Sequence, residues 1–246
     1  MRLLRNLAFY CTFYIGSIVL TSCALICLPF DRGWFRYFVH AWSGLHRWAV
    51  IHLLGCELRV EGTVADEPVL YAIKHESFFE AIDAPTLLPT PGVFAKQELF
   101  RIYGWGHAGR AYGLIPVQRN AGARALMTMI REARAMAADG RPLAIFPEGT
   151  RVPHGERRAL QSGFAGLYKM LGLPVVPVAV NSGPAYHRLL KRGLPITYRI
   201  GSPIPPGLPR DEIEFRVLDG INALNDGLSE GRADTHDGSH PARSAA

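Results

Sequence analysis

The sequence predicts an α/β fold, in which helices cover a β-sheet, preceded by an N-terminal helical segment embedded in a membrane. Three observations lead to this prediction. The first is a run from residue 7 to residue 30 without a charged side chain. The second is the alternation, from residue 58 onward, of short apolar stretches with helical patterns. The third is the length of 246 residues, which suits one ordinary domain plus an appendage.

The uncharged run is long enough to cross the roughly 30 Å apolar core of a bilayer as a helix. Arg2 and Arg5 precede it, and Asp31 and Arg32 follow it. A cleaved signal peptide would have a shorter apolar core and a small-residue cleavage site, and no such site follows. We therefore expect a retained membrane anchor. Because basic residues flank the run on both sides, their pattern does not decide between a single span and a helical hairpin in one leaflet.

A second helical pattern follows the anchor. Apolar side chains recur at helical spacing between residues 35 and 53, while Arg36, His40 and Arg47 fall together on the opposite face. An aromatic and aliphatic face opposite a basic face is typical of a helix that lies in the headgroup layer. The alternative is a helix that packs on the folded domain.

Short apolar stretches predict the strands of the sheet. Pro177 lies inside the fourth of them, which favours an edge strand or a strand end because proline cannot donate a ladder hydrogen bond. Two helical patterns are also clear, one ending at Gly140 and one between residues 213 and 224. From about residue 229 the chain has no apolar period, and we expect a disordered tail. The expected strands are residues 69–73, 93–95, 143–146, 175–180 and 197–200.

The composition restricts the class of partner. The formal net charge is +6, and most of the basic residues are Arg, which binds phosphate and carboxylate bidentately. This favours a phosphate-bearing partner, and the alternative is a GC-rich genome that encodes Arg in place of Lys. The cysteines, Cys11, Cys23, Cys27 and Cys56, have no metal-binding spacing, so we expect buried reduced thiols and no metal site.

The stretch KHESFFE, residues 74–80, has two interpretations. In the structural one, Ser77 caps a helix, Glu80 completes a capping box, and His75 merely ends a strand. In the functional one, the Glu80 carboxylate holds the His75 ring, fixes its tautomer and leaves the other nitrogen free as a base. The stretch alone does not decide between them.

Three further motifs follow along the chain. FPEGTR, residues 146–151, is a rigid turn that presents a carboxylate and a guanidinium to one place, and the alternative is a loop with a local salt bridge. GLIPVQR, residues 113–119, is a short apolar turn that delivers Arg119. VVPVAV, residues 175–180, is a buried strand.

In this order and spacing, the four motifs resemble those of the glycerolipid acyltransferases, especially the 1-acyl-sn-glycerol-3-phosphate acyltransferases, over about residues 58–204. That family carries a His-x4-Asp motif, and here Glu80 stands in place of the aspartate. Asp83 is the nearest aspartate but lies eight positions after His75. Because Glu has one more methylene, its carboxylate can still reach the ring, and we favour Glu80 over Asp83. The resemblance implies a mixed β-sheet flanked by helices.

The resemblance also implies an activity. A fatty acyl group would pass from acyl-CoA or acyl carrier protein to the sn-2 hydroxyl of 1-acyl-glycerol 3-phosphate, giving phosphatidic acid without a further cofactor. His75 would be the general base and Glu80 would orient it. The partners would be the bilayer, the lysophospholipid and the acyl thioester. The implied substrate-binding residues are Lys96, Arg119, Glu148, Gly149, Thr150 and Arg151.

On this reading the chain has three parts. Residues 1–57 are the membrane anchor, residues 58–228 the catalytic domain, and residues 229–246 the tail. The enzyme would lie on the cell inner membrane with its catalytic domain facing the cytoplasm, where both acyl donors are found.

Other functions stay open. The reaction could use another acceptor, namely a lyso-ornithine lipid, glycerol 3-phosphate or another lysophospholipid. The Asp-to-Glu change would suit a catalytically silent lipid-binding protein. A lipid hydrolase is disfavoured because the chain has no G-x-S-x-G motif.

Two further classes of site are set aside. Residues 104–109 match G-x-G-x-x-G but join no clear strand to a helix, and there is no P-loop, so we expect no nucleotide site. We also expect no nucleic-acid partner. The remaining histidines without partners at metal spacing are interpreted as structural or solvent-facing; they are His40, His46, His52, His107, His154 and His187.

Overall fold

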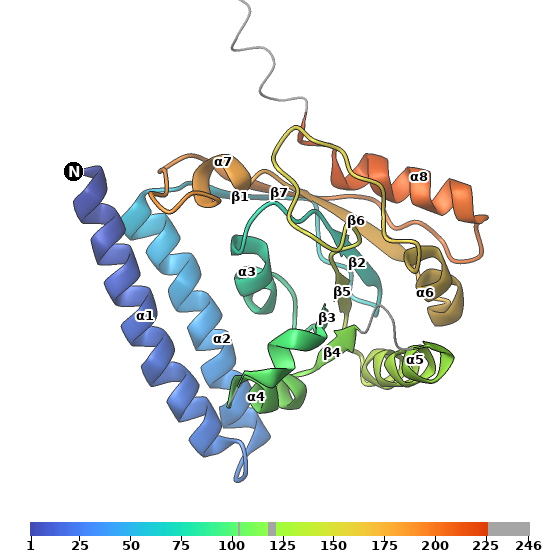
Figure 1. Ribbon diagram of the computed structural model, residues 1–246, viewed down its shortest axis with the longest axis horizontal. Coiled ribbons are helices and arrows are strands. Elements are labelled where there is room, and N and C mark those ends of the chain that lie inside the picture. The colour runs from blue at the N-terminus through green and yellow to red at the C-terminus, as the bar shows by residue number, and fades with distance from the viewer. Residues whose placement is uncertain (103, 118–121, 226–246) are drawn as a thin grey trace, which may run out of the picture.

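The computed structural model describes residues 1–102, 104–117 and 122–225. Within them, the strands are β1 (Leu58–Glu61), β2 (Leu70–Ile73), β3 (Gly92–Lys96), β4 (Leu114–Val117), β5 (Leu143–Ile145), β6 (Val175–Val180) and β7 (Ile196–Ile200). They form one sheet in the order β1-β7-β6-β2-β5-β3-β4 (Figure 1). The strands from β6 to β4 run parallel, whereas β6 and β7 are antiparallel. The sheet is therefore mixed, as the family resemblance implies.

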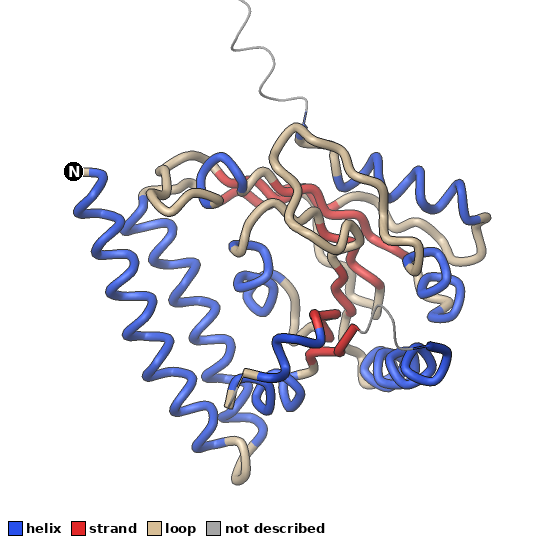
Figure 2. Tube along the Cα trace, in the orientation of Figure 1, coloured by secondary structure: helices blue, strands red, loops and turns tan. Residues whose placement is uncertain are grey.

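Helices cover both faces of the sheet (Figure 2). They are α1 (Arg2–Cys27), α2 (Arg32–Ala49), α3 (Phe79–Leu87), α4 (Trp105–Tyr112), α5 (Gly122–Ala138), α6 (Phe164–Leu171), α7 (Gly183–Tyr186) and α8 (Arg210–Ile221). Side chains alternate along β2, so that Tyr71 and Ile73 join one core and Leu70 and Ala72 the other. The first core includes side chains of α1, α2, α3 and α7, and the second those of α5, α6 and α8.

The five expected strands correspond to β2, β3, β5, β6 and β7, each within one residue of its expected ends. The two clear helical patterns are α5 and α8. The prediction of an apolar turn at residues 113–119 is wrong, because Leu114–Val117 pairs with β3 as strand β4. β1 is not predicted at all. Both strands lie at the edges of the sheet, and β1 is mostly exposed, so that its residues form no apolar run.

Of the two positions expected for Pro177, an edge strand is wrong, because β6 lies inside the sheet between β7 and β2. Backbone groups alternate along a strand, and those of the odd-numbered residues in β6 face β7. The β6–β7 ladder ends at the pair of Val178 and Ile200. Beyond it, the Pro177 carbonyl still accepts a hydrogen bond from the Gly201 N–H. The missing proline N–H thus falls at the end of the ladder, where the chain leaves β7.

The N-terminal segment folds as a helical hairpin of α1 and α2 (Figure 1). Among the described residues, α1 is the one helix that is long and apolar enough to cross a membrane. The two helices approach closely at Gly16, where a Cβ atom would collide with the Leu45 side chain. Next to it, the Trp42 indole N–H donates to the Ser17 hydroxyl over 2.9 Å.

α2 packs on the folded domain through one face, while Trp34, Tyr37 and Trp48 stay exposed, so its position in the headgroup layer stays a prediction. Arg47 forms an ion pair with Asp83 of α3, and His40 lies 3.3 Å from the Thr90 hydroxyl. Two of the three side chains of the expected basic face thus contact the domain. Phe9 of α1 belongs to the same core as the sheet, so residue 57 is not a packing boundary. The expected tail, residues 229–246, lies outside the described residues.

The expectation of buried thiols holds for Cys56 alone. Cys11 is exposed, and Cys23 and Cys27 are partly exposed. These three cysteines belong to α1, whose outer face is not covered by any other part of the described chain. The same face leaves many apolar side chains of α1 exposed.

Candidate active site

The turn between β2 and α3, residues 74–78, lies at the carboxyl end of β2. β2 has the parallel strands β6 and β5 on either side. The loops that follow parallel strands form the usual ligand-binding edge of such a sheet. The loop after β5, which carries FPEGTR, starts at this same edge. Because β2 and β5 are neighbours in the sheet, KHESFFE and FPEGTR come together at this edge.

His75 and Glu80 form a hydrogen-bonded pair in this turn. The Nδ1 atom of His75 lies 3.1 Å from Oε1 of Glu80. The imidazole packs against the Phe146 ring with centroids 4.4 Å apart, and 17% of the His75 side chain is exposed. When Nδ1–H donates to the carboxylate, Nε2 carries no proton, which is the form that a general base needs.

Both interpretations of KHESFFE describe part of this geometry. Glu80 accepts hydrogen bonds from the Ser77 N–H at 2.7 Å and from the Ser77 hydroxyl at 3.0 Å, in addition to the bond from His75. The Ser77 hydroxyl accepts a hydrogen bond from the Phe79 N–H over 3.0 Å, so Ser77 caps the helix as predicted, although the regular helix starts only at Phe79. The hydrogen bond from the Ser77 N–H to the Glu80 carboxylate is the one that a capping box predicts.

The bonds around Glu80 stabilise its ionised form. Burial alone would raise the pKa of this carboxyl, but the His75 ring, the Ser77 N–H and the Ser182 hydroxyl outweigh burial and hold the pKa below its usual value. Ser182, which follows β6, donates to Oε2 over 2.7 Å. Glu80 is therefore placed to act as an anion that orients His75 and stabilises its protonated form.

Asp83, the other candidate partner of His75, is occupied by α2. Its two carboxylate oxygens accept from Arg47 Nε at 2.7 Å and Arg47 Nη2 at 2.6 Å. Burial raises the pKa of Asp83, and the Arg47 guanidinium acts against this rise. The geometry thus favours Glu80 as the partner of His75 and leaves Asp83 to attach the hairpin.

A buried ion pair of Lys74 and Glu148 supports the turn from inside. Lys74 Nζ lies 2.7 Å from Glu148 Oε1 and also donates to Asn222 Oδ1 and the Glu156 carbonyl, which uses all three ammonium protons. Glu148 Oε2 accepts from the His75 N–H over 3.3 Å. Burial raises the pKa of Glu148, and Lys74 opposes the rise. Both oxygens of Glu148, a predicted substrate residue, therefore bind the protein.

Arg151 lies beside the turn. Its guanidinium sits over the ring of Phe78, with Cζ 4.1 Å from the ring centroid. Gly149 has a φ of 66°, a conformation that favours glycine, and so turns the chain from the buried Glu148 toward the surface. Thr150, between Gly149 and Arg151 in the sequence, is partly exposed. The structure thus brings these FPEGTR residues to the His75 turn.

The other two predicted substrate residues are less closely placed. Lys96 is exposed at the carboxyl end of β3, on the same edge of the sheet as His75. Arg119 lies outside the described residues. Within the described ranges, no group of three or more His, Cys, Asp or Glu side chains could hold a metal ion.

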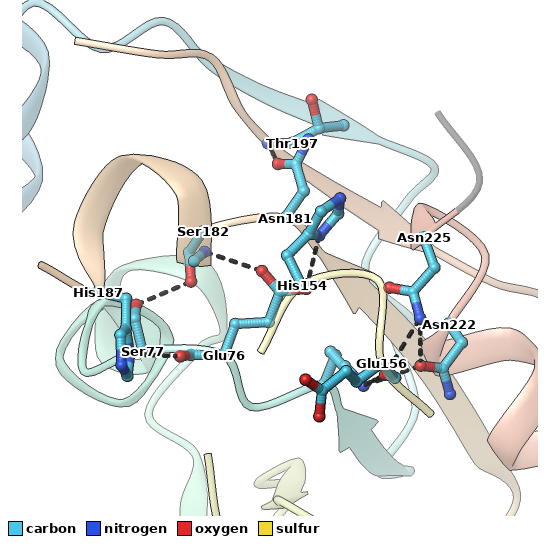
Figure 3. A network of polar contacts seen from close by, with 12 residues as sticks. Glu76, Ser77, His154, Glu156, Asn181, Ser182, His187, Thr197, Asn222 and Asn225 are labelled. Carbon is cyan, nitrogen blue, oxygen red and sulfur yellow. Dashed lines mark hydrogen bonds and ion pairs between the residues drawn. The ribbon is translucent and has the colours of Figure 1, made fainter. Parts of the chain in front are cut away.

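A second histidine–glutamate pair lies beside the first. His154 Nδ1 is 2.8 Å from Glu76 Oε1, and Glu76 Oε2 accepts from the Gly183 N–H over 2.8 Å. Figure 3 shows the Glu76 carboxylate between His154 and the chain at Ser182. Glu76 and His154 are 78 positions apart, so no spacing in the sequence points to this pair.

The turn also holds the loop that follows β5. This loop has no helix or strand between residues 147 and 163. The Val152 N–H donates to the His75 carbonyl over 2.7 Å, and the pair of Glu76 and His154 adds a side-chain bond two residues later. The position of Arg151 therefore depends on the turn that carries His75.

Comparison with known proteins identifies the family. The family model described as Acyltransferase matches residues 57–181, just over half of the chain. The chain belongs to the Acyltransferase family. It is 28% identical over 158 residues to the 1-acyl-sn-glycerol-3-phosphate acyltransferase of Pseudomonas aeruginosa, a match that spans 63% of this chain and 61% of that relative.

Two further proteins extend the likeness over nearly the whole chain. The 1-acyl-sn-glycerol-3-phosphate acyltransferase of Cocos nucifera is 28% identical over 235 residues, which cover 91% of this chain and 74% of that protein. The crystal structure of the 1-acyl-sn-glycerophosphate (LPA) acyltransferase PlsC from Thermotoga maritima matches with a TM-score of 0.72 at 21% identity. That match covers 96% of this chain and 100% of the other, and it establishes a shared fold.

Proposed function

We propose that this protein is a membrane-bound 1-acyl-sn-glycerol-3-phosphate O-acyltransferase. It moves a fatty acyl group from acyl-CoA or acyl carrier protein to the sn-2 hydroxyl of 1-acyl-glycerol 3-phosphate and so forms phosphatidic acid. The main support is the pair of His75 and Glu80, 3.1 Å apart, on a turn that also contacts Arg151. Membership of the Acyltransferase family and the names of the relatives agree with it.

In this mechanism His75 is the general base. Its Nε2 takes the proton of the sn-2 hydroxyl while the hydroxyl oxygen bonds to the thioester carbonyl carbon. The tetrahedral adduct then collapses, the C–S bond breaks, and the proton on Nε2 passes to the departing thiolate. Glu80 keeps the Nδ1–H in place and stabilises the imidazolium that forms between the two steps. A base positioned in this way accelerates such a reaction by about 10²–10⁴-fold.

The acceptor's phosphate is bound by Arg151, Arg119 and Lys96. Arg151 is exposed and held beside the His75 turn by the Phe78 ring, so its guanidinium can meet a phosphate near the reacting hydroxyl. A hydrogen bond between charged groups contributes about 1.5–3 kcal/mol. In this proposal Gly149 and Thr150 shape the loop that presents Arg151.

The α1–α2 hairpin holds the active site at the cytoplasmic surface of the inner membrane, where acceptor and product reside. The outer face of α1 is apolar, with exposed side chains such as Ile15 and Ile18. α2 is tied to α3 by the ion pair of Arg47 and Asp83. Since both helices lie along the domain, we favour a hairpin in one leaflet over a single span.

The test incubates membranes containing the purified protein with labelled acyl-CoA and a panel of acceptors. We expect preference for lysophosphatidate. Preference for glycerol 3-phosphate or another phosphate-bearing lysolipid would keep the reaction and change the acceptor. Activity only on an acceptor without phosphate, such as a lyso-ornithine lipid, would contradict the role of Arg151. Release of free fatty acid without any acceptor would indicate a hydrolase.

A further inference from the structure

The loop between α7 and β7, residues 187–195, lies close to the start of α1 (Figure 1). Three leucine side chains of this loop are exposed. Leu189 is 80% exposed, and Leu190 and Leu194 are exposed as well. Single exposed leucines are common on protein surfaces, but three within one short loop form an apolar surface that calls for a partner.

α1 fixes this loop through the loop's backbone. Tyr10 donates its hydroxyl proton to the Leu189 carbonyl over 2.5 Å, and Arg2 donates to the next carbonyl over 2.8 Å. The Asn6 side chain bonds both the carbonyl and the N–H of Lys191, at 3.1 and 2.8 Å. Positions 2, 6 and 10 lie on one side of a helix. The loop is therefore attached along the first three turns of α1.

The first turns of α1 are themselves apolar on their outer face. Leu3, Leu4 and Leu7 are exposed, and Ile15 and Ile18 continue this face toward the other end of the helix. The exposed leucines of the loop therefore extend the apolar surface that α1 presents.

The charges around this surface are basic. Residues 1–30 and residues 183–196 contain no Asp or Glu. Arg188 and Arg192 of the loop and Arg2 of α1 are exposed. An apolar surface with a basic rim complements an anionic phospholipid bilayer, whose acyl chains accept leucines and whose headgroups accept arginines.

We propose that residues 187–195 form a second membrane-contacting segment of this protein, in which Leu189 and Leu190 enter the leaflet beside the start of α1. The inference rests on the proposed membrane association of α1 and adds a contact made by the folded domain itself. The loop also reaches the active site, because His187 Nδ1 lies 3.2 Å from the Glu76 carbonyl. Contact with lipid at this loop would therefore help to fix the depth and orientation of the His75 turn at the bilayer.

The test places one spin label in the lipid-facing loop. Cys11, Cys23 and Cys27 are replaced by serine, the buried Cys56 is kept, and Leu189→Cys is labelled with a nitroxide. Two matched variants carry the label at other exposed positions: Ile18→Cys on α1, where the side chain is 68% exposed, and Phe215→Cys on α8, where it is 71% exposed. Power saturation is measured in vesicles of mixed phosphatidylcholine and phosphatidylglycerol, with oxygen and a water-soluble nickel chelate as the relaxing agents.

We expect the labels at 189 and 18 to be relaxed more by oxygen, and the label at 215 more by the chelate. If 18 is lipid-exposed and 189 behaves like 215, the loop proposal is wrong while the membrane association of α1 stands. If 18 is also aqueous, the proposed membrane association fails. A label at 189 that neither agent reaches would mean that a protein surface, such as a second copy, covers the loop, and this too contradicts the proposal.

A second measurement needs no substitution. Hydrogen–deuterium exchange of the unmodified chain is measured in two kinds of vesicle. One contains phosphatidylcholine and phosphatidylglycerol, and the other contains phosphatidylcholine alone. We expect slower exchange at residues 187–195 in the vesicles that contain phosphatidylglycerol, and no difference in α8. Equal exchange of the loop in both kinds of vesicle would contradict the role of anionic headgroups.

Discussion

The two histidine–glutamate pairs of this protein have similar geometry and different surroundings. In each pair an Nδ1 atom meets a fully buried glutamate, at 3.1 Å for His75 and Glu80 and at 2.8 Å for His154 and Glu76. The His75 side chain is 17% exposed, whereas that of His154 is 9% exposed. The Nε2 atom of His154 is buried and has no hydrogen-bond partner among the described residues.

This difference shows that a hydrogen bond between a histidine and a carboxylate does not by itself make the two residues a catalytic pair. A general base needs a second ring nitrogen that a substrate can reach. The protein closes off that nitrogen in His154 but leaves the His75 ring partly open to solvent. We therefore expect the first pair to move a proton and the second to hold the loop that carries Arg151.

Glu80→Gln breaks the first pair at nearly constant size. A neutral amide does not stabilise the protonated His75 ring, so kcat for acyl transfer to lysophosphatidate should fall by about 10²–10⁴-fold. Steady-state kinetics with labelled acyl-CoA measure this effect. Glu80→Asp, which restores the usual side chain of the family's motif, is the matched control and should retain more activity. Unchanged kcat in Glu80→Gln would remove Glu80 from the mechanism.

Arg151→Met tests the residue that the second pair positions. Loss of one charge-assisted contact of about 1.5–3 kcal/mol should raise KM for lysophosphatidate by roughly 10–150-fold. The control is Arg157→Gln, because Arg157 makes an exposed ion pair with Asp219 and such pairs contribute little. An unchanged KM in Arg151→Met would show that this guanidinium does not bind the phosphate.

His154→Gln and Glu76→Gln break the second pair. A buried polar group that loses its partner costs about 1–3 kcal/mol of unfolding free energy, which urea unfolding measures. We expect KM for lysophosphatidate to rise less than in Arg151→Met, with little change in kcat, because the first pair stays intact. A large fall in kcat at constant KM would instead make the second pair part of proton transfer.

The smallest effect concerns stability at low pH. The folded pKa of Glu80 lies below the unfolded value of about 4.3, so the ionised form adds stability that is complete above this value. That stability is lost as the pH falls through the folded pKa. Thermal unfolding of wild type and Glu80→Gln across this range measures it, and the wild type should lose more stability in acid than the variant. Parallel losses in the two proteins would contradict this assignment.

Local patterns in the sequence predict much of the fold and of the first pair. The interior strands are apolar on both faces and so read as continuous runs, as at Val175–Val180. His75 and Glu80 are five positions apart across a strand end and a first helical turn. Local geometry alone can therefore bring them together, whichever interpretation of the turn is chosen.

Contacts between distant parts of the chain could not be predicted in this way. The sequence pattern places Arg47 on a basic helix face, yet Arg47 forms an ion pair with Asp83 in the folded protein. Glu76 and His154 meet because the loop after β5 folds back over the turn after β2. Pro177 is tolerated inside the sheet because the neighbouring strand departs at that point. Each of these depends on which strands become neighbours, and a single sequence does not encode that in a local pattern.

The most direct test of the contrast between the two pairs compares His75→Asn with His154→Asn in the same membranes, with equal amounts of folded protein. Initial rates of phosphatidic acid formation are measured with saturating lysophosphatidate and labelled acyl-CoA. We expect His75→Asn to lose at least about 100-fold in rate and His154→Asn to stay within about tenfold of wild type. Near wild-type activity of His75→Asn, or an equal loss in both variants, would contradict the account.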